Sequence, residues 1–130
     1  MASIFTKIID GELSCHKIYE DEKHLSFLDI RPIRAGHCLV IPKKEVDYIF
    51  DMEDGELAEL VCVAKKVAKA VQKAIPCKKI GMTVIGIEVP HTHIHLMPID
   101  AVGDFDFSKA KNGDQDQLKE LALKISSHLS

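Results

Sequence analysis

The sequence predicts an α+β fold, with an antiparallel sheet, a long helix on one side of it and a short N-terminal helix. Strand-like runs at 17–20 and 24–28 are separated by three polar residues, which is typical of a hairpin. Between Asp51 and Ile75, apolar residues recur at the i, i+3, i+4 spacing of a long amphipathic helix. Hairpins combined with a helix set apart from them favour the α+β class.

The remaining elements follow from the same local patterns. Ser3 is a candidate cap for a short helix over 3–10, and Gly11 suits the position after its end. Pro32 and Gly36 mark the stretch 29–36 as a loop. The other expected elements are a third strand at 37–41 ended by Pro42, a fourth at 79–87, a fifth at 91–98, and a last amphipathic helix near 118–129.

Composition limits the classes of function. The 130 residues suit one domain, and 17 basic against 20 acidic residues give a net charge of 17 − 20 = −3, which argues against nucleic-acid binding. No apolar run approaches the ~20 residues that span a bilayer, and the first residues lack a signal-peptide layout, so we expect a cytoplasmic protein without a membrane partner. The four cysteines are expected to be free, mostly buried thiols.

Histidines carry the candidate chemistry. The chain has seven, and His91, His93 and His95 alternate with other residues. On a strand, this period of two places all three imidazoles on one face. Three adjacent half-polar rings are an unusual way to build an apolar core, so a functional role is favoured over a structural one. His37, at the start of another expected strand, joins them if the two strands are close.

Two kinds of site are compatible with this cluster. Imidazole is a common zinc ligand, but His91 and His95 would lie ~13 Å apart along an ideal strand, so a metal would need further ligands, such as Glu88 or Asp100. Neutral imidazole is also a nucleophile towards phosphorus. Its neighbours on the same face could then bind phosphate oxygens or protonate a leaving group.

Residues 91–97, HTHIHLM, resemble the His-φ-His-φ-His-φ-φ signature of the histidine triad (HIT) family, where φ is an apolar residue. The segments 5–13, 19–22, 27–30 and 36–44 also resemble the family, in the same order. The resemblance covers about residues 3–98 of a single domain over 1–130. Residues 99–130 form a C-terminal loop and helix without a clear counterpart.

The resemblance implies a homodimer with a five-stranded antiparallel sheet in each protomer and the small nucleotide hydrolase or transferase activity of the Hint and Fhit branches. His93 would be the nucleophile that forms a nucleotidyl-histidine. His95 would contact the α-phosphate and the leaving-group side, and His91 and His37 would hold the hydrogen-bond network. Asp29 would bind ribose hydroxyls, although it also suits a turn before Pro32. The apolar wall around the base would consist of Phe5, Ile8, Phe27 and Ile30, which from their pattern alone are core residues.

The departures from the family pattern affect the metal and the substrate. Many relatives hold zinc with two N-terminal cysteines, a further histidine and the first triad histidine; the matching positions here are Ser3, Thr6 and Glu45, so we expect no metal and no cofactor. Ile87 and Glu88 replace polar groups that relatives place before the triad. The expected substrate is a purine nucleoside phosphoramidate, or a dinucleoside polyphosphate. The alternatives are a nucleotide-binding scaffold with vestigial catalysis and a metal-dependent hydrolase using the same histidines.

Overall fold

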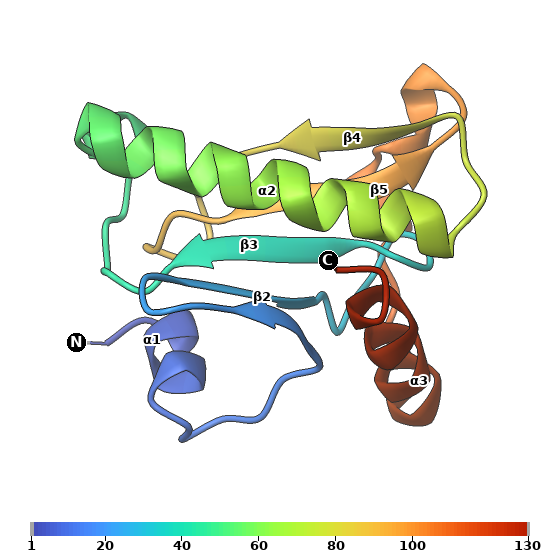
Figure 1. Ribbon diagram of the computed structural model, residues 1–130, viewed down its shortest axis with the longest axis horizontal. Helices are drawn as coiled ribbons and strands as arrows, with labels where there is room; N and C mark the ends of the chain where they lie inside the picture. The colour runs from blue at the N-terminus through green and yellow to red at the C-terminus, as the bar shows by residue number, and fades with distance from the viewer. Residues whose placement is uncertain (1, 130) are drawn as a thin grey trace.

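A five-stranded antiparallel sheet in the order β1-β2-β3-β5-β4 forms the centre of the computed structural model, which describes residues 2–129 (Figure 1). This arrangement confirms the predicted α+β class. The strands are β1 (Lys17–Glu20), β2 (His24–Leu28), β3 (Cys38–Pro42), β4 (Lys79–Thr83) and β5 (Ile94–Ile99). The helices are α1 (Ile4–Ile9), α2 (Asp54–Ala74) and α3 (Gln115–Ser126).

The two faces of the sheet are covered by different helices. On one face, Val40, Ile94 and Leu96 pack in the main core with buried residues of α2 and α3. Figure 1 shows α2 lying across this face, with α3 near its C-terminal end. On the other face, Leu39 and its neighbours pack with Phe5 of α1. Because side chains alternate along a strand, successive residues of β3 and β5 serve the two faces in turn.

Local sequence signals account for the ends of the helices. The Ser3 side chain accepts a hydrogen bond from the Thr6 backbone N–H, as expected of a cap, and Gly11 has a φ of +83° just beyond α1. The helix predicted between Asp51 and Ile75 is α2, preceded by a 3-10 turn. The C-terminal helix packs on its own sheet, where the Ser126 hydroxyl donates to the Ile18 carbonyl at 2.9 Å.

Three expectations about the chain were wrong in detail. The fourth strand ends at Thr83 rather than at residue 87, since Gly86 has a left-handed φ of +72°. The fifth begins at Ile94 rather than at residue 91. The four cysteines are free, but only Cys38 is buried. Cys62 is exposed because the buried face of α2, which includes residues 60, 63, 64 and 67, packs on the sheet and Cys62 lies on the other side of the helix. Within residues 2–129, no helix is both long and apolar enough to cross a bilayer.

Candidate active site

The triad histidines lie at the entry of β5, on the sheet face that carries α1. His95 pairs with Leu39 of β3, and the α1-side core includes Leu39. His91 and His93 precede the strand, contrary to the expectation of one continuous strand. Phe5 of α1 contacts both rings, with centroids 5.8 Å from His91 and 5.0 Å from His93. The three rings therefore lie on the same face of the sheet. Only His95 is within β5, so strand alternation accounts for the position of His95 but not for those of His91 and His93.

An irregular turn carries His91 and His93 because the chain before β5 is anchored elsewhere. Pro90 has no N–H to offer to a strand ladder. Both the backbone N–H and the hydroxyl of Thr92 donate to the Val46 carbonyl, each at 2.7 Å. These two hydrogen bonds to Val46, in a distant loop, fix the position of the turn. No local pattern in the sequence predicts them.

His93 presents an unprotonated ring nitrogen. Its Nδ1 lies 2.7 Å from the His91 carbonyl oxygen, which can only accept a hydrogen bond, so Nδ1 carries the proton. In the neutral ring, Nε2 then holds the lone pair. The ring is 7% exposed, and Nε2 makes no hydrogen bond within residues 2–129. No buried side-chain N or O atom in that range lacks a partner, so Nε2 reaches the surface. This is the state that a nucleophile requires.

His95 offers the complementary group, a proton donor. The Ile33 backbone N–H donates to Nδ1 of His37 at 3.0 Å, so the neutral His37 carries its proton on Nε2. That N–H donates to Nδ1 of His95 at 2.9 Å, which leaves the His95 proton on Nε2. The rings of His93 and His95 are 5.0 Å apart. The lone pair of His93 and the N–H of His95 therefore belong to neighbouring rings.

Burial keeps these imidazoles neutral. His37, His91 and His95 are 1%, 0% and 8% exposed. Desolvation, together with the repulsion of positive charge on His93 and His37, lowers the pKa of His95 to about 3. Desolvation also lowers the pKa of His37 and of His91, against the opposing attraction of Asp29 and of the Pro42 carbonyl respectively. The hydrogen bonds derived for neutral His37, His91 and His95 therefore hold at neutral pH.

Asp29 lies beside this pair, at the end of β2. One carboxylate oxygen accepts from the Arg31 N–H at 2.9 Å, which is the turn role, and the other lies 3.6 Å from Nε2 of His37. Because His37 is neutral, this contact is not an ion pair. Asp29, His37 and His95 are close enough to suggest a metal site. However, ligation through Nε2 of neutral His37 would need the proton on Nδ1, where the Ile33 N–H already donates. The cluster fits a hydrogen-bond relay better than a metal site.

Gly36 sets the position of His37. Its φ is +95°, and a Cβ there would lie 2.5 Å from Cδ1 of Ile75 and 3.0 Å from Cγ of Pro98. We expect Gly36→Ala to lower the free energy of unfolding by about 2 kcal/mol or more, from left-handed strain and overpacking. Urea denaturation measures this change. Gly55→Ala is the matched control, because its Cβ meets nothing within 4 Å in a helix; equal stability of the two variants would contradict the assignment.

The residues expected around the base are divided between core and surface. Phe5 and Phe27 are buried with ring centroids 5.7 Å apart, and Ile8 packs partly buried beside them. Ile30 is 57% exposed and lies outside both core clusters, so its interpretation as a core residue was wrong. An exposed Ile30 remains available to a ligand.

A second hydrogen-bonded group joins α1 to the triad. The Ser3 hydroxyl lies 2.8 Å from Nδ1 of His91. Glu45 accepts from the Ser3 backbone N–H at 2.7 Å and from the Thr6 hydroxyl at 2.6 Å. Nε2 of His91 lies 2.8 Å from the Pro42 carbonyl. We call Ser3, Thr6, Glu45 and His91 the α1 latch.

Two aromatic residues beside the triad were not predicted as part of the site. Phe107 lies edge-on to His95 with centroids 4.9 Å apart, and Phe105 lies 6.0 Å from His37. Both belong to the segment after β5, which has no clear local periodicity. The only sequence signal for a role in the site was the presence of two phenylalanines in a polar loop. The contact between Phe107 and His95 depends on how that loop folds back over the sheet.

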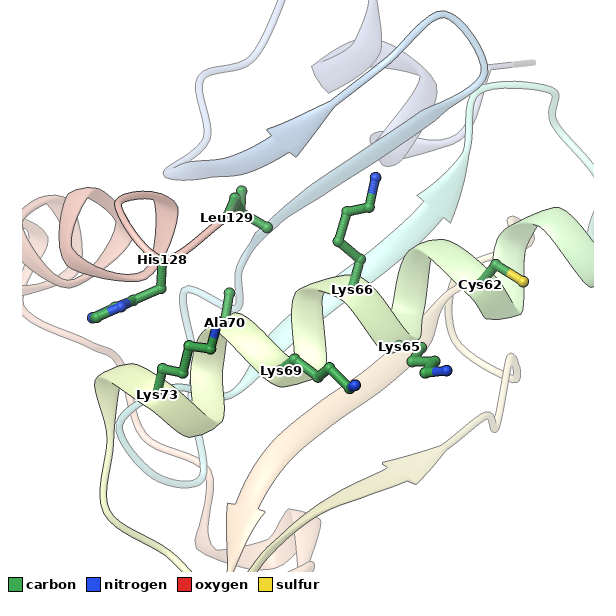
Figure 2. Close-up of a pocket in the computed structure, with 8 residues that line it drawn as sticks. All are labelled: Cys62, Lys65, Lys66, Lys69, Ala70, Lys73, His128 and Leu129. Atoms are coloured by element: carbon green, nitrogen blue, oxygen red, sulfur yellow. The ribbon is translucent and has the colours of Figure 1, made fainter.

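A lysine-rich groove lies on the opposite face of the molecule. It measures about 310 Å³ and runs along α2 near His128 and Leu129 (Figure 2). Its lysines, Lys65, Lys66, Lys69 and Lys73, are exposed, as expected of a solvated helix face. Because α2 covers the sheet face away from the triad, this groove is separate from the histidine site.

Comparisons with known proteins agree with this geometry. Residues 10–102 match the HIT domain. An uncharacterised HIT-like protein of Borreliella burgdorferi is 35% identical over 97% of both chains, and the adenosine 5′-monophosphoramidase hnt1 of Schizosaccharomyces pombe is 34% identical over 75% of this chain and 74% of its own. A zinc-bound histidine triad family protein from Mycobacterium smegmatis superposes with a TM-score of 0.84 at 27% identity, over 99% of this chain and 94% of the other. The chain belongs to the histidine triad family.

Proposed function

We propose that the protein is a cytoplasmic nucleoside 5′-monophosphate hydrolase or transferase that works through a covalent intermediate on His93. The observation that carries this proposal is the pairing of an unprotonated Nε2 on His93 with an N–H donor on His95. Relatives named as adenosine 5′-monophosphoramidases support a nucleotide substrate.

In the first step, Nε2 of His93 attacks the α-phosphorus, the Nε2–P bond forms and the bond to the leaving group breaks. The His95 N–H donates a hydrogen bond to the phosphoryl group, where charge develops. A departing amine takes one proton from solvent. The nucleotidyl imidazole is cationic, and the His91 carbonyl stabilises its Nδ1–H. Water then attacks the phosphorus, the Nε2–P bond breaks, and the water proton returns to solvent.

The residues around His93 and His95 favour an uncharged leaving group over a polyphosphate. Within residues 2–129, the hydrogen-bond and ring partners of His93 and His95 are His91, His37, Phe5 and Phe107, and none carries a positive charge at neutral pH. A polyphosphate leaving group requires cationic partners more than an amine does. We therefore prefer a purine nucleoside phosphoramidate over a dinucleoside polyphosphate as substrate.

Homodimerisation is part of the proposal. β4 is an edge strand of the sheet, and the edge of a sheet presents unpaired backbone groups. Met82, Ile85 and Ile87 at and beyond this strand are 57%, 53% and 84% exposed. These apolar residues support a second copy of the chain as the partner at this edge.

The test is turnover of adenosine 5′-phosphoramidate in the presence of a metal chelator. We expect release of adenosine monophosphate, with the chelator having no effect. Rapid quenching at alkaline pH, where a phosphohistidine-type bond survives, should trap a nucleotidyl adduct detectable by intact-protein mass. Nucleotide binding without turnover would instead favour the scaffold alternative, which the replacements at Ile87 and Glu88 motivate. Activity abolished by the chelator would favour the metal-dependent alternative.

A further inference from the structure

The resemblance to zinc-binding relatives places their metal at the positions of the α1 latch, and the donor set of this chain does not suit zinc. Zinc in proteins takes thiolate, imidazole and carboxylate ligands, whereas Ser3 and Thr6 offer neutral hydroxyls. Bonds of ~2.0–2.1 Å in a tetrahedron hold ligand atoms about 3.3 Å apart. Here Ser3 Oγ lies 2.8 Å from Nδ1 of His91, and Thr6 Oγ1 lies 2.6 Å from Oε1 of Glu45. Both distances are shorter than the separation of two zinc ligands. The atoms bond to one another rather than around a metal.

Each proton in the latch has a defined place. Nε2 of His91 donates to the Pro42 carbonyl, so Nδ1 of the neutral ring accepts from the Ser3 hydroxyl. The Ser3 oxygen in turn accepts from the Thr6 backbone N–H at 3.0 Å. Both remaining donors, the Ser3 N–H and the Thr6 hydroxyl, point to the same oxygen of Glu45. Glu45 thus accepts from both the cap residue Ser3 and Thr6 of α1, and adds to the direct bond between them.

The latch reaches the nucleophile through His91. Its buried ring is held by Ser3 and Pro42, while its backbone carbonyl receives the Nδ1–H of His93 at 2.7 Å. Any rotation of the His91 residue therefore moves the acceptor that fixes the tautomer of His93. The same α1 also places Phe5 against the His93 ring.

We propose that Glu45 is a positioning residue: its carboxylate, acting through Ser3 and Thr6, holds His91 and so orients His93. The kinetic part of this inference rests on the proposed function. Within residues 2–129, Glu45 accepts from Ser3 and Thr6 and lies 3.9 Å from Nδ1 of His91, so it acts on orientation rather than on chemistry.

The test compares Glu45→Ala with Glu45→Gln. The glutamine side chain keeps an oxygen that accepts from Ser3 and Thr6, so we expect its kcat to stay within about threefold of wild type. Alanine removes the acceptor, and we expect kcat for adenosine 5′-phosphoramidate to fall about 10- to 100-fold with little change in KM, by analogy with the loss of a partner that orients a metal-bound histidine. Glu59→Ala, which removes an exposed carboxylate paired with Lys23, is the matched control.

A second readout does not depend on turnover. Ring ¹⁵N signals in the substrate-free protein report which nitrogen of His91 and His93 is protonated. We expect Glu45→Ala to shift them and Glu45→Gln to preserve them. If Glu45→Ala fails to fold, Thr6→Val removes one donor to Glu45 at similar volume and should give a smaller shift of the same kind.

The outcomes separate the two proposals. Failure of the wild type to turn over any nucleoside phosphoramidate overturns the proposed function, and the ¹⁵N signals then decide on the latch by themselves. Unchanged ring signals and unchanged kcat in Glu45→Ala overturn the positioning role. One equivalent of zinc in the isolated protein, with loss of activity on its removal, also overturns it.

Discussion

Replacing His93 by alanine is expected to lower kcat/KM for adenosine 5′-phosphoramidate by at least about a thousandfold, because the proposed covalent mechanism then has no nucleophile. In the part of the chain that the structure describes, no neighbouring histidine has a free lone pair that could replace that of His93. His95 faces the site with an N–H, and its lone pair is engaged by His37 at 2.9 Å. His91 has both ring nitrogens occupied, by Ser3 and by Pro42. Steady-state kinetics of the two proteins at neutral pH measures the change.

His128→Ala is the control for this substitution, since His128 lines the lysine-rich groove on the opposite side of the sheet. It should keep wild-type turnover. Adenosine monophosphate should still bind to the His93→Ala protein, because Phe5, Phe27 and Asp29 are unaltered. Equal turnover by His93→Ala and wild type would show that the nucleophile is another group.

Acidification from pH 6.5 to 5 is expected to lower the free energy of unfolding steeply. The pKa of buried His95 is lowered from its ordinary value of 6.5 to about 3, so the unfolded chain binds more protons than the folded one within this window. Each histidine that stays neutral in the folded protein but is protonated in the unfolded chain lowers the free energy of unfolding by up to about 1.4 kcal/mol per pH unit. His37 and His91 are shifted in the same direction and add to the slope.

Urea denaturation at a series of pH values measures this slope. Hydrogen bonds from Thr6 and Ser3 lower the pKa of Glu45 from 4.5 to about 2, so its contribution to stability is lost mainly below pH 4.5, outside the window. His95→Gln should flatten the slope, whereas His128→Gln should leave it steep. A free energy of unfolding that stays constant from pH 6.5 to 5 in the wild type would mean that the buried rings accept protons without cost.

Local signals in the sequence predicted the elements that are determined locally. The Ser3 cap, the Gly11 end of α1, the β1–β2 hairpin and the apolar stripe of α2 each depend on neighbouring residues, and each was found. The motif also predicted correctly that His37, His91, His93 and His95 come together. What it could not give is their protonation, because the tautomers depend on the Ile33 N–H and on carbonyls of His91 and Pro42.

The errors and omissions have one physical cause, which is long-range contact. The start of β5 is set by Thr92 bonding to Val46, 46 positions away. Phe107 reaches His95 only because the chain after β5 folds back. The Ser3–His91 bond of the latch joins residues 88 positions apart. No periodicity or residue pair in the sequence encodes such contacts, so they required the fold itself.

The strand order β1-β2-β3-β5-β4 also has a kinetic consequence. β5 is the last strand in the chain, yet it lies between β3 and β4 and carries His95, with His93 just before it. Synthesis therefore reaches this strand after α1, β3 and α2 have been made. Closing such a long loop is entropically slow compared with forming the hairpin. The histidines therefore come together when β5 enters the sheet, so the proposed site forms in the same event that completes the sheet.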